Sequence, residues 1–377
     1  MDKKLYMYFP ENDLALAAAT PSYTAPAAAL RLHRAGEALP IWEARPGDRF
    51  VCSGINARWL GQTLEAFGIE DVDVYDHYAT DLEAAPWGWS AASRRAMADA
   101  GYPMELMPDD DALEFLRALS HRRTSIRLAE AVAAALPFAV TEAATEAADT
   151  DRVRDYLAMH GHVIAKAPWS SSGRGIVRSR NMPADVFLRQ AEGIIRRQGS
   201  VLLEQEWDKA LDFALLFEAD GQGKVERRGV SVFDTTPHGG YCANVLADQD
   251  TLTARVATLA GRERFEAVAE AVAGALPAII GPYRGPLGVD MLVCADGTID
   301  AAVELNLRRT MGFVALGFAR YLAPGTQGRL IVTAEPAPPP TPAVTDSCGR
   351  LVGGVFDLTP PDPHFAFRAV IDTPQTH

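Results

Sequence analysis

Length, composition and charge limit what this chain can be. Its 377 residues are too many for one ordinary domain, so two or three compact units are expected. Hydrophobic residues make up 48% of the chain and charged residues 23%, which is typical of a soluble globular protein. The formal net charge of −13 repels a phosphate backbone. This charge argues against nucleic acid as a main partner, but not against a local basic site.

Cysteine spacing and apolar runs bear on the compartment. The four cysteines are far apart and form no C-x-x-C pair, which indicates reduced thiols rather than a disulfide framework or a zinc site. The N-terminus turns polar too early for a signal peptide, and no apolar run approaches the length of a membrane span. The sequence therefore predicts a cytoplasmic protein that does not engage a membrane. It leaves the oligomeric state open.

The first part of the chain alternates short strands and helices. Strands are expected at residues 4–9, 39–42, 50–52 and 72–75, and helices at about 25–35 and 55–67. Such alternation is typical of a small domain with a parallel sheet. Two further helices are predicted at 109–119 and 122–136, the first with acidic residues near its positive end.

From about residue 140 the pattern changes, and more strands are expected. We predict helices at 149–159, 184–197 and 252–276, and strands at 162–166, 176–179, 201–206, 213–218 and 225–233. Strands at 287–293 and 299–307 form a predicted hairpin around Asp296-Gly297. The proline-rich segment 335–342 is predicted to be a linker to a final β hairpin at 350–356 and 365–371.

A lysine and a flexible loop form the first motif that suggests chemistry. Lys166 ends a predicted strand, and the glycine- and serine-rich loop 167–175 follows at once. Glycine and serine let backbone N–H groups approach phosphate oxygens, and the lysine supplies the compensating charge. The spacing is not that of a Walker A loop. The alternative is a surface hairpin whose lysine faces solvent.

Acidic residues within apolar strands form the second motif. Asp290 interrupts one apolar strand, and Glu304 and Asn306 end the next. Burying acids without a partner is expensive, so a cation should meet them, and their oxygens are the ligands that Mg²⁺ prefers. A three-residue loop at 296–298 would place Asp290 opposite Glu304 and Gly288 opposite Asn306, and we predict this register. The alternative is a salt-bridged surface hairpin.

Taken in order, these motifs resemble those of the ATP-grasp superfamily over residues 120–333. The matching elements are Lys166 with its loop, Glu204-Gln205-Glu206-Trp207, Asp290, and Glu304-Leu305-Asn306-Leu307-Arg308. The resemblance implies an α/β fold in which two α+β subdomains clamp ATP after a small parallel α/β domain. The expected units are residues 1–118 for that domain, 119–200 for the small (lid) subdomain, 201–334 for the large subdomain, and 335–377 for the linker and hairpin.

The same resemblance assigns expected roles to individual residues. Lys166 would contact the α- and β-phosphates, and the loop residues Ser170, Ser171, Ser172, Gly173, Arg174 and Gly175 would close over the β- and γ-phosphates, with Lys166 and Arg174 also catalytic. Glu204, Gln205, Glu206 and Trp207 would hold adenine, largely through backbone groups, and Asp212 would bind ribose. Asp290, Glu304 and Asn306 would hold one or two Mg²⁺ ions, which Mn²⁺ is expected to replace. Two departures stand out: Asp212 replaces the usual glutamate, and only arginines stand where many relatives carry a lysine. Of these, Arg123 is the best match, with a helix-surface arginine as the alternative.

For the acceptor carboxylate, the resemblance favours Arg308 as the catalytic cation. Arg309 is a second candidate, but alternation along a strand directs the two side chains to opposite faces. Arg228 is a third candidate, with a solvent-facing strand charge as the alternative. Asn12 and Asp13 follow the first strand, where open α/β sheets bind ligands. Trp87 and Trp89 would either pack domains together or contact a bulky second substrate.

The predicted function is an ADP-forming ligase. ATP and Mg²⁺ would activate a small-molecule carboxylate through an acylphosphate, which an amine or a thiol then displaces. One alternative is an ATP-grasp kinase that phosphorylates a hydroxyl group, and another is an ATP-binding protein without turnover. The sequence does not identify the carboxylate or the acceptor.

Overall fold

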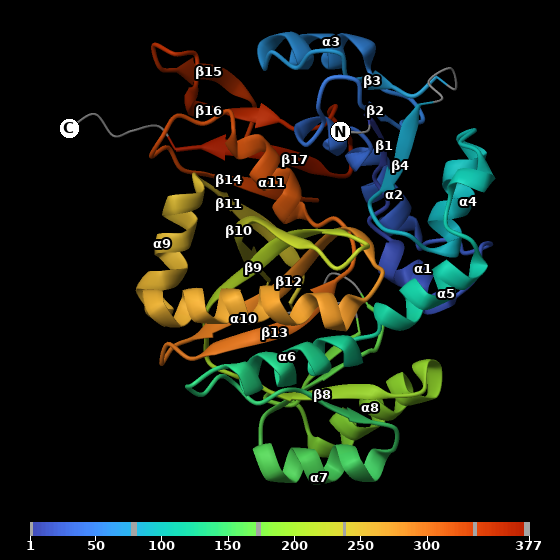
Figure 1. Ribbon diagram of the computed structural model, residues 1–377, viewed down its shortest axis with the longest axis vertical. Coiled ribbons are helices and arrows are strands. Elements are labelled where there is room, and N and C mark those ends of the chain that lie inside the picture. The colour runs from blue at the N-terminus through green and yellow to red at the C-terminus, as the bar shows by residue number, and fades with distance from the viewer. Residues whose placement is uncertain (1–2, 77–80, 171–174, 237–238, 335–337, 373–377) are drawn as a thin grey trace.

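The computed structural model describes residues 3–76, 81–170, 175–236, 239–334 and 338–372. Its N-terminal unit contains a parallel sheet, as predicted (Figure 1). The strands are β1 (Lys3–Met7), β2 (Arg49–Phe50), β3 (Asp73–Val74) and β4 (Leu82–Pro86), in the order β3-β2-β1-β4. The helices are α1 (Asn12–Ala18), α2 (Ala27–Gly36), α3 (Ala57–Ala66) and α4 (Ala91–Asp99), with the short 3₁₀ helix η2 (Met104–Leu106).

One strand predicted in this unit is a helix instead. Leu39–Trp42 forms the 3₁₀ helix η1, in which all four residues are buried. Pro40 lacks the N–H that a strand ladder requires and has a backbone φ suited to a helical first turn. The prediction of a strand at 39–42 was therefore wrong, because burial produced an apolar run without sheet pairing.

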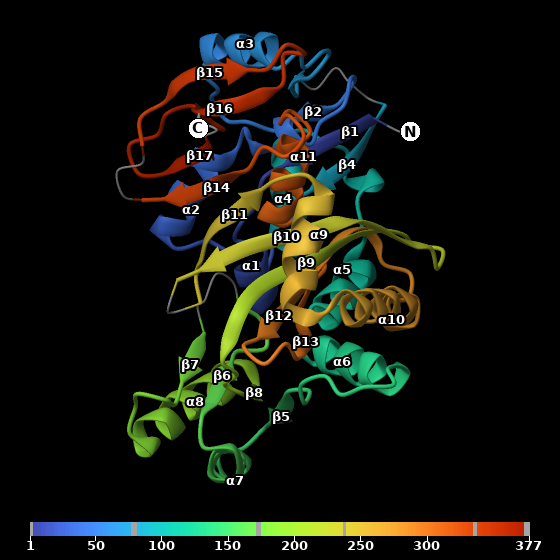
Figure 2. The same ribbon diagram turned by 90° about the vertical axis from the view of Figure 1, so that its left-hand side faces the viewer.

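The lid subdomain is a four-stranded antiparallel sheet with helices packed on it. Its strands are β5 (Thr145–Ala147), β6 (Val163–Lys166), β7 (Ile176–Arg178) and β8 (Val201–Gln205), in the order β5-β8-β6-β7. Helices α7 (Thr150–His160) and α8 (Ala184–Gln198) close its small core. β8 pairs within this sheet, although the predicted boundary at residue 200 assigned it to the next unit. The sheet and its two helices project from the rest of the molecule (Figure 2).

The largest sheet has nine strands in the order β13-β12-β9-β10-β11-β14-β17-β16-β15. They are β9 (Lys209–Asp220), β10 (Val225–Thr235), β11 (Tyr241–Leu246), β12 (Arg284–Cys294), β13 (Ile299–Asn306), β14 (Gly328–Thr333), β15 (Thr341–Thr345), β16 (Leu351–Asp357) and β17 (Ala366–Ile371). The predicted C-terminal hairpin exists, and because β17 pairs with β14 it extends this sheet.

Helices cover both faces of the large sheet. On β9, Phe213, Leu215 and Phe217 pack into one core with α5 (Asp110–Leu119), α6 (Arg123–Ala135), α9 (Gln249–Ala260) and α10 (Arg262–Ile280). The alternate residues Ala214 and Leu216 face α11 (Met311–Ala319) on the other side, as strand alternation requires. α5 and α6 therefore pack with the large subdomain rather than with the lid. The helix predicted at 252–276 is in fact two helices, because Gly261 between them has φ of +86°, outside the helical region.

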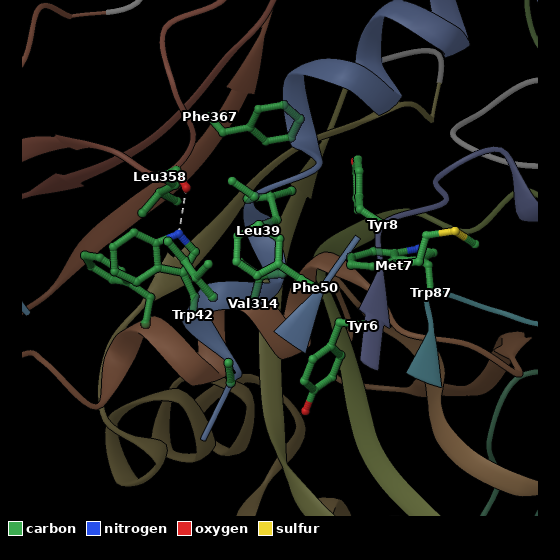
Figure 3. Close-up of a cluster of buried hydrophobic side chains, with 14 of the residues drawn as sticks. Tyr6, Met7, Tyr8, Leu39, Trp42, Phe50, Trp87, Val314, Leu358 and Phe367 are labelled. Carbon is green, nitrogen blue, oxygen red and sulfur yellow. Dashed lines mark hydrogen bonds between the residues drawn. The ribbon is translucent and has the colours of Figure 1, made fainter. Parts of the chain in front are cut away.

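The N-terminal unit, α11 and the C-terminal strands share one core. Figure 3 shows Trp42, Phe50, Val314 and Phe367 within it, and the indole Nε1 of Trp42 donates to the carbonyl of Leu358 at 2.7 Å. Aromatic rings from segments far apart in the chain thus fix the N-terminal unit to the large sheet. Within the described residues, no helix is both long and apolar enough to cross a membrane. The four cysteines form no disulfide, as predicted.

A buried ion pair also joins these two units. Arg309 Nε donates to Glu43 Oε2 at 3.1 Å, and the guanidinium lies over the ring of Tyr6 at 4.6 Å. Both charged side chains are buried. Burial raises the pKa of Glu43, and the charge of Arg309 opposes this rise. The pair is therefore costly to break from either side.

We expect Arg309→Ala to lower the free energy of unfolding by about 3–5 kcal/mol, because Glu43 is left buried without a cation. The loss should grow as the pH rises, since a carboxylate whose folded pKa is raised is destabilising when it ionises. Urea unfolding at several pH values measures both effects. The matched control is Arg189→Ala, which removes an exposed helical ion pair and should change stability by less than about 0.5 kcal/mol. Equal losses in the two variants would contradict the expectation.

Candidate active site

Three oxygen-bearing side chains meet on the β12–β13 hairpin. Asp290 pairs with Glu304 and Gly288 with Asn306, so the predicted register is confirmed. The Asn306 amide Nδ2 donates to Asp290 Oδ2 at 3.0 Å. We call Asp290, Glu304 and Asn306 the acidic trio. Their oxygens are of the type that Mg²⁺ prefers.

The register has a different cause from the one predicted. The three loop residues are 295–297, with Gly297 at φ of +85°, and Val293 pairs with Ile299. This turn alone would place Asp290 opposite Ala302. A register shift between Asp290 and Leu292 moves the pairing by two residues, to Glu304. The irregularity, and not the turn, therefore brings the two carboxylates together.

Electrostatics at the acidic trio favour a bound cation. Burial, and then the charge of Glu304, raise the pKa of Asp290 to about 7. Burial also opposes ionisation of Glu304, yet Arg122 outweighs it and the pKa of Glu304 is lowered. Among the residues that the structure describes, no three His, Cys, Asp or Glu side chains converge as a metal site. An ion held here would therefore depend on Asn306 and on the oxygens of a second ligand to complete its shell.

Arg122 connects the acidic trio to the start of the glycine- and serine-rich loop. Its guanidinium donates to Glu304 Oε1 at 2.7 Å, to the carbonyl of Ala167 at 2.7 Å and to Ser170 Oγ at 2.6 Å. The side chain is 7% exposed, and its Nε atom is buried without a hydrogen-bond partner. Arg122 is therefore a fixed cation facing the place where the phosphates of a nucleotide are expected.

The sequence favoured Arg123 for binding phosphate, and that role stays a prediction, although the structure places Arg122 rather than Arg123 beside the trio. Arg123 is 57% exposed and pairs with Glu146 at 2.7 Å, away from the trio. On α6 the buried positions are Thr124, Ser125, Leu128 and Val132. Arg122 precedes the buried Ser125 by three residues, so the helical phase could have identified it as the arginine that faces Glu304.

Lys166 lies on the side of Arg122 that faces away from the acidic trio. Its ammonium contacts Glu204 Oε1 at 2.5 Å, and both side chains are largely buried. Lys166, Glu204 and Arg122 line a cavity of about 20 Å³ between the lid and β13, which we call the lid cavity. That space has room for about one water molecule and none for a nucleotide. A nucleotide bound at Lys166 would therefore have to part the lid from β13.

The segment predicted to bind adenine, residues 204–207, begins on β8, the strand that pairs with the Lys166 strand β6. Glu206 donates its backbone N–H to the carbonyl of His162 at 2.9 Å, so this N–H is not free for adenine. Its carboxylate pairs with Arg178 at 2.9 Å and with Arg180 at 3.2 Å. Gln205 ends β8, and the indole Nε1 of Trp207 is buried without a partner. The roles of these residues in binding adenine remain predictions.

Several other predicted residues can be placed. Asp212 accepts from Thr235 Oγ1 at 2.9 Å and pairs with Lys209, so its carboxylate is already engaged. Gly175 has φ of +72°, which favours glycine there. Four of the loop residues, Ser171, Ser172, Gly173 and Arg174, lie outside the described residues. Arg228 is exposed and lies 3.9 Å from Glu226, which fits the alternative of a solvent-facing charge.

Arg308 points toward the N-terminal unit. Its Nε donates to Asp13 Oδ2 at 2.9 Å and its NH2 atom lies 2.7 Å from the same oxygen, with both side chains 15% exposed. Gly88 packs so closely that an added Cβ would lie 2.9 Å from Arg308 Cβ. Arg309 faces the opposite way, toward Glu43, as strand alternation predicted.

A cavity of about 210 Å³ lies against the acidic trio, between the large sheet and the N-terminal unit. We call it the central cavity. Arg122 and Arg308 line it together with the trio and with Thr310, Met311 and Gly312 at the start of α11. Arg122 lines both cavities, so the trio and Lys166 lie on either side of one side chain and are not separated by packed core.

The arrangement defines a class: an α/β protein with a lysine-bearing lid sheet facing a carboxylate-bearing sheet. Solved structures that resemble this chain fit the same description. Biotin carboxylase from Campylobacter jejuni, described as a β-γ-ATP complex, matches with a TM-score of 0.54 at 12% identity over 99% of this chain and 88% of that chain. The biotin carboxylase domain of Hydrogenobacter thermophilus 2-oxoglutarate carboxylase, with MgADP, ADP and bicarbonate, matches with a TM-score of 0.53 at 13% identity over 99% and 87%. No protein-family model and no curated protein matches the sequence.

Both of these structures are ATP-grasp enzymes, and this chain has the ATP-grasp fold. The fold predicted from the ordered motifs is thereby confirmed. Sequence reasoning missed Arg122, the start of α11 and the polar residues Ser231, Tyr241 and Asn244, which also line the central cavity. The last three lie on β10 and β11, and nothing in the sequence marked them as neighbours of the trio.

We expect Asp290→Asn to stabilise the protein in the absence of metal and nucleotide. The amide keeps the hydrogen bond to Asn306 and removes a carboxylate whose folded pKa, about 7, lies above the ordinary value of 3.8. Since such a group loses stability as the pH rises through its folded pKa, the gain should be larger at pH 8 than at pH 5. Thermal unfolding at both pH values measures it. Exposed Asp250→Asn is the control, and an Asp290→Asn variant no more stable than wild type at pH 8 would contradict the expectation.

Arg122 and its neighbour provide a matched pair of variants. We expect Arg122→Gln to weaken binding of Mg-ATP by about 10- to 100-fold, because a charge-assisted contact contributes about 1.5–3 kcal/mol. Arg123→Gln should change the dissociation constant by less than about twofold, because Arg123 pairs on the exposed surface. Calorimetric titration with a non-hydrolysable ATP analogue measures both. The reverse order of effects would restore Arg123 as the nucleotide ligand.

Proposed function

We propose that the chain is an ATP- and Mg²⁺-dependent ligase that activates a small-molecule carboxylate and couples it to an amine or a thiol. The observation that carries this proposal is the central cavity, where the acidic trio, Arg122 and Arg308 share one wall. Phosphoryl transfer requires mainly positioning and charge neutralisation, and this wall offers groups for both. The ATP-grasp fold is consistent with it.

In this proposal the lid side holds the nucleotide. Lys166 and Arg122 would balance the phosphate charge, and Ser170 would present the start of the phosphate loop. Asp290, Glu304 and Asn306 would hold Mg²⁺. The ion, when bound, withdraws charge from the phosphate oxygens and orients them. The nucleotide would also release Glu204 and Glu304 from their present cationic partners.

The acceptor carboxylate would lie between Arg308 and the start of α11. Thr310 makes no side-chain cap, and Thr310, Met311 and Gly312 line the cavity. Uncapped N–H groups at a helix start favour negative charge, and a nearby guanidinium adds to that preference. Asp13 pairs with Arg308. This pairing fixes the guanidinium in place and partly neutralises its charge. A carboxylate oxygen held here would face the γ-phosphate at the trio, as acylphosphate formation requires.

Trapping the activated acid tests this function. With Mg-ATP, a panel of carboxylic acids and hydroxylamine as the amine, we expect ADP release together with a hydroxamate, because an acylphosphate reacts with hydroxylamine. Glu304→Ala should reduce the rate at least about 100-fold, since a metal ligand is lost. Lys224→Ala, at an exposed β turn, is the control and should behave as wild type. A phosphorylated hydroxyl product without hydroxamate would favour a kinase, and tight Mg-ATP binding without ADP release across the panel would favour a protein without turnover.

A further inference from the structure

The central cavity is polar at one end and apolar at the other. Strand order sets its direction, because the trio stands on β12 and β13 and the cavity continues over β10, β11, β14 and β17. We call the part over β11, β14 and β17 the apolar end. Its side chains are Tyr8, Leu32, Trp87, Val332 and Phe367.

Charge is confined to the other end. Among the described residues that line the cavity, the charged ones are Arg122, Asp290, Glu304 and Arg308, all beside the trio. Between the two ends, polar side chains satisfy one another. Asn244 Nδ2 donates to Ser231 Oγ at 2.7 Å, and the Tyr241 hydroxyl donates to Asn244 Oδ1 at 2.8 Å. This part of the wall therefore offers a substrate hydrogen bonds but no ionic partner.

Packed aromatic rings close the apolar end. The ring of Tyr8 meets that of Trp87 edge-on with centroids 4.8 Å apart, and that of Phe367 with centroids 6.3 Å apart (Figure 3). Phe367 and Val332 are directly paired on β17 and β14, so both side chains point to the same face. All three rings are buried and belong to the core that joins the N-terminal unit to the C-terminal strands. Packed aromatic rings therefore form the wall of the apolar end.

We infer that the carboxylate substrate carries an uncharged, apolar group of branched-chain or single-ring size, which fills this apolar end. The inference rests on the proposed function and adds the substrate class. With its carboxylate at Arg308, the substrate would extend across Ser231 and Asn244 toward Val332 and Phe367. A second charge on that group would lose its hydration and find no counter-ion, whereas an apolar group gains from leaving water.

Acids that share one carboxylate but differ at the far end test this inference. The panel contains 4-methylpentanoate, 3-phenylpropionate, glutarate and 4-aminobutyrate, with propionate as the minimal acid. Hydroxamate formation is measured with Mg-ATP and hydroxylamine. We expect kcat/KM for the two apolar acids to exceed that for glutarate and 4-aminobutyrate by at least about 10-fold, which corresponds to about 1.4 kcal/mol.

A filling substitution with a matched control locates the effect. Leu32 lines the cavity from α2, whereas Leu30 lies on the same helix, is also half-buried and does not line it. Leu32→Phe should lower kcat/KM for 3-phenylpropionate at least about 10-fold while leaving that for propionate within about twofold, because only the far end is filled. Leu30→Phe should leave both unchanged. Thermal unfolding of each variant shows that it is folded.

The outcomes separate the two proposals. Hydroxamate formation that favours glutarate or 4-aminobutyrate would overturn the substrate class and leave the ligase function standing. Equal effects of Leu32→Phe and Leu30→Phe on 3-phenylpropionate would do the same. If no acid produces hydroxamate or ADP, the ligase function fails, and the inference about its substrate fails with it.

Discussion

The site depends on one electrostatic constraint: two carboxylates face each other across buried strands and cannot both be charged without a cation nearby. Asp290 is paired with Glu304 on the ladder, and burial raises its pKa to about 7. Arg122 meets this demand on the lid side, and the same guanidinium holds Ala167 and Ser170 at the start of the phosphate loop. The contacts of Arg122 thus link the large sheet, the start of helix α6 and the lid.

The segment after β13 distributes two further charges. Arg308 turns toward Asp13 and the central cavity, and Arg309 turns toward Glu43 and the core of the N-terminal unit. Adjacent residues therefore contribute separately to the cavity wall and to the core, because the backbone directs them to opposite sides. The N-terminal unit accordingly helps to form the site: Asp13 orients Arg308, and Tyr8 and Trp87 form part of the cavity wall. A cavity built from several units lets the fold keep a common nucleotide site while its acceptor pocket varies.

Much of the candidate site could be predicted from local patterns. Strand alternation identified the shared face of Glu304 and Asn306, and the lysine-loop motif located the lid strand β6. The hairpin register was predicted correctly, but from the wrong turn, because a bulge is a tertiary adjustment that strand periodicity does not reveal. Arg123 was chosen over Arg122 because position within a motif was read without the helical phase. Pro40 and Gly261 show the same limit, since in each case one residue with an unusual backbone preference, restricted for proline and permissive for glycine, overrode an apolar pattern.

The sequence by itself determined the parallel first sheet, the lysine-bearing strand with its loop, and the shared face of Glu304 and Asn306. These follow from spacing along the chain, which local backbone geometry converts directly into shared faces. Only the tertiary structure decided which arginine meets Glu304, that Arg308 pairs with Asp13, and that Tyr8, Val332 and Phe367 close one pocket. Those contacts join residues tens to hundreds of positions apart, and their formation depends on how whole layers pack. No periodicity within a single segment carries that information.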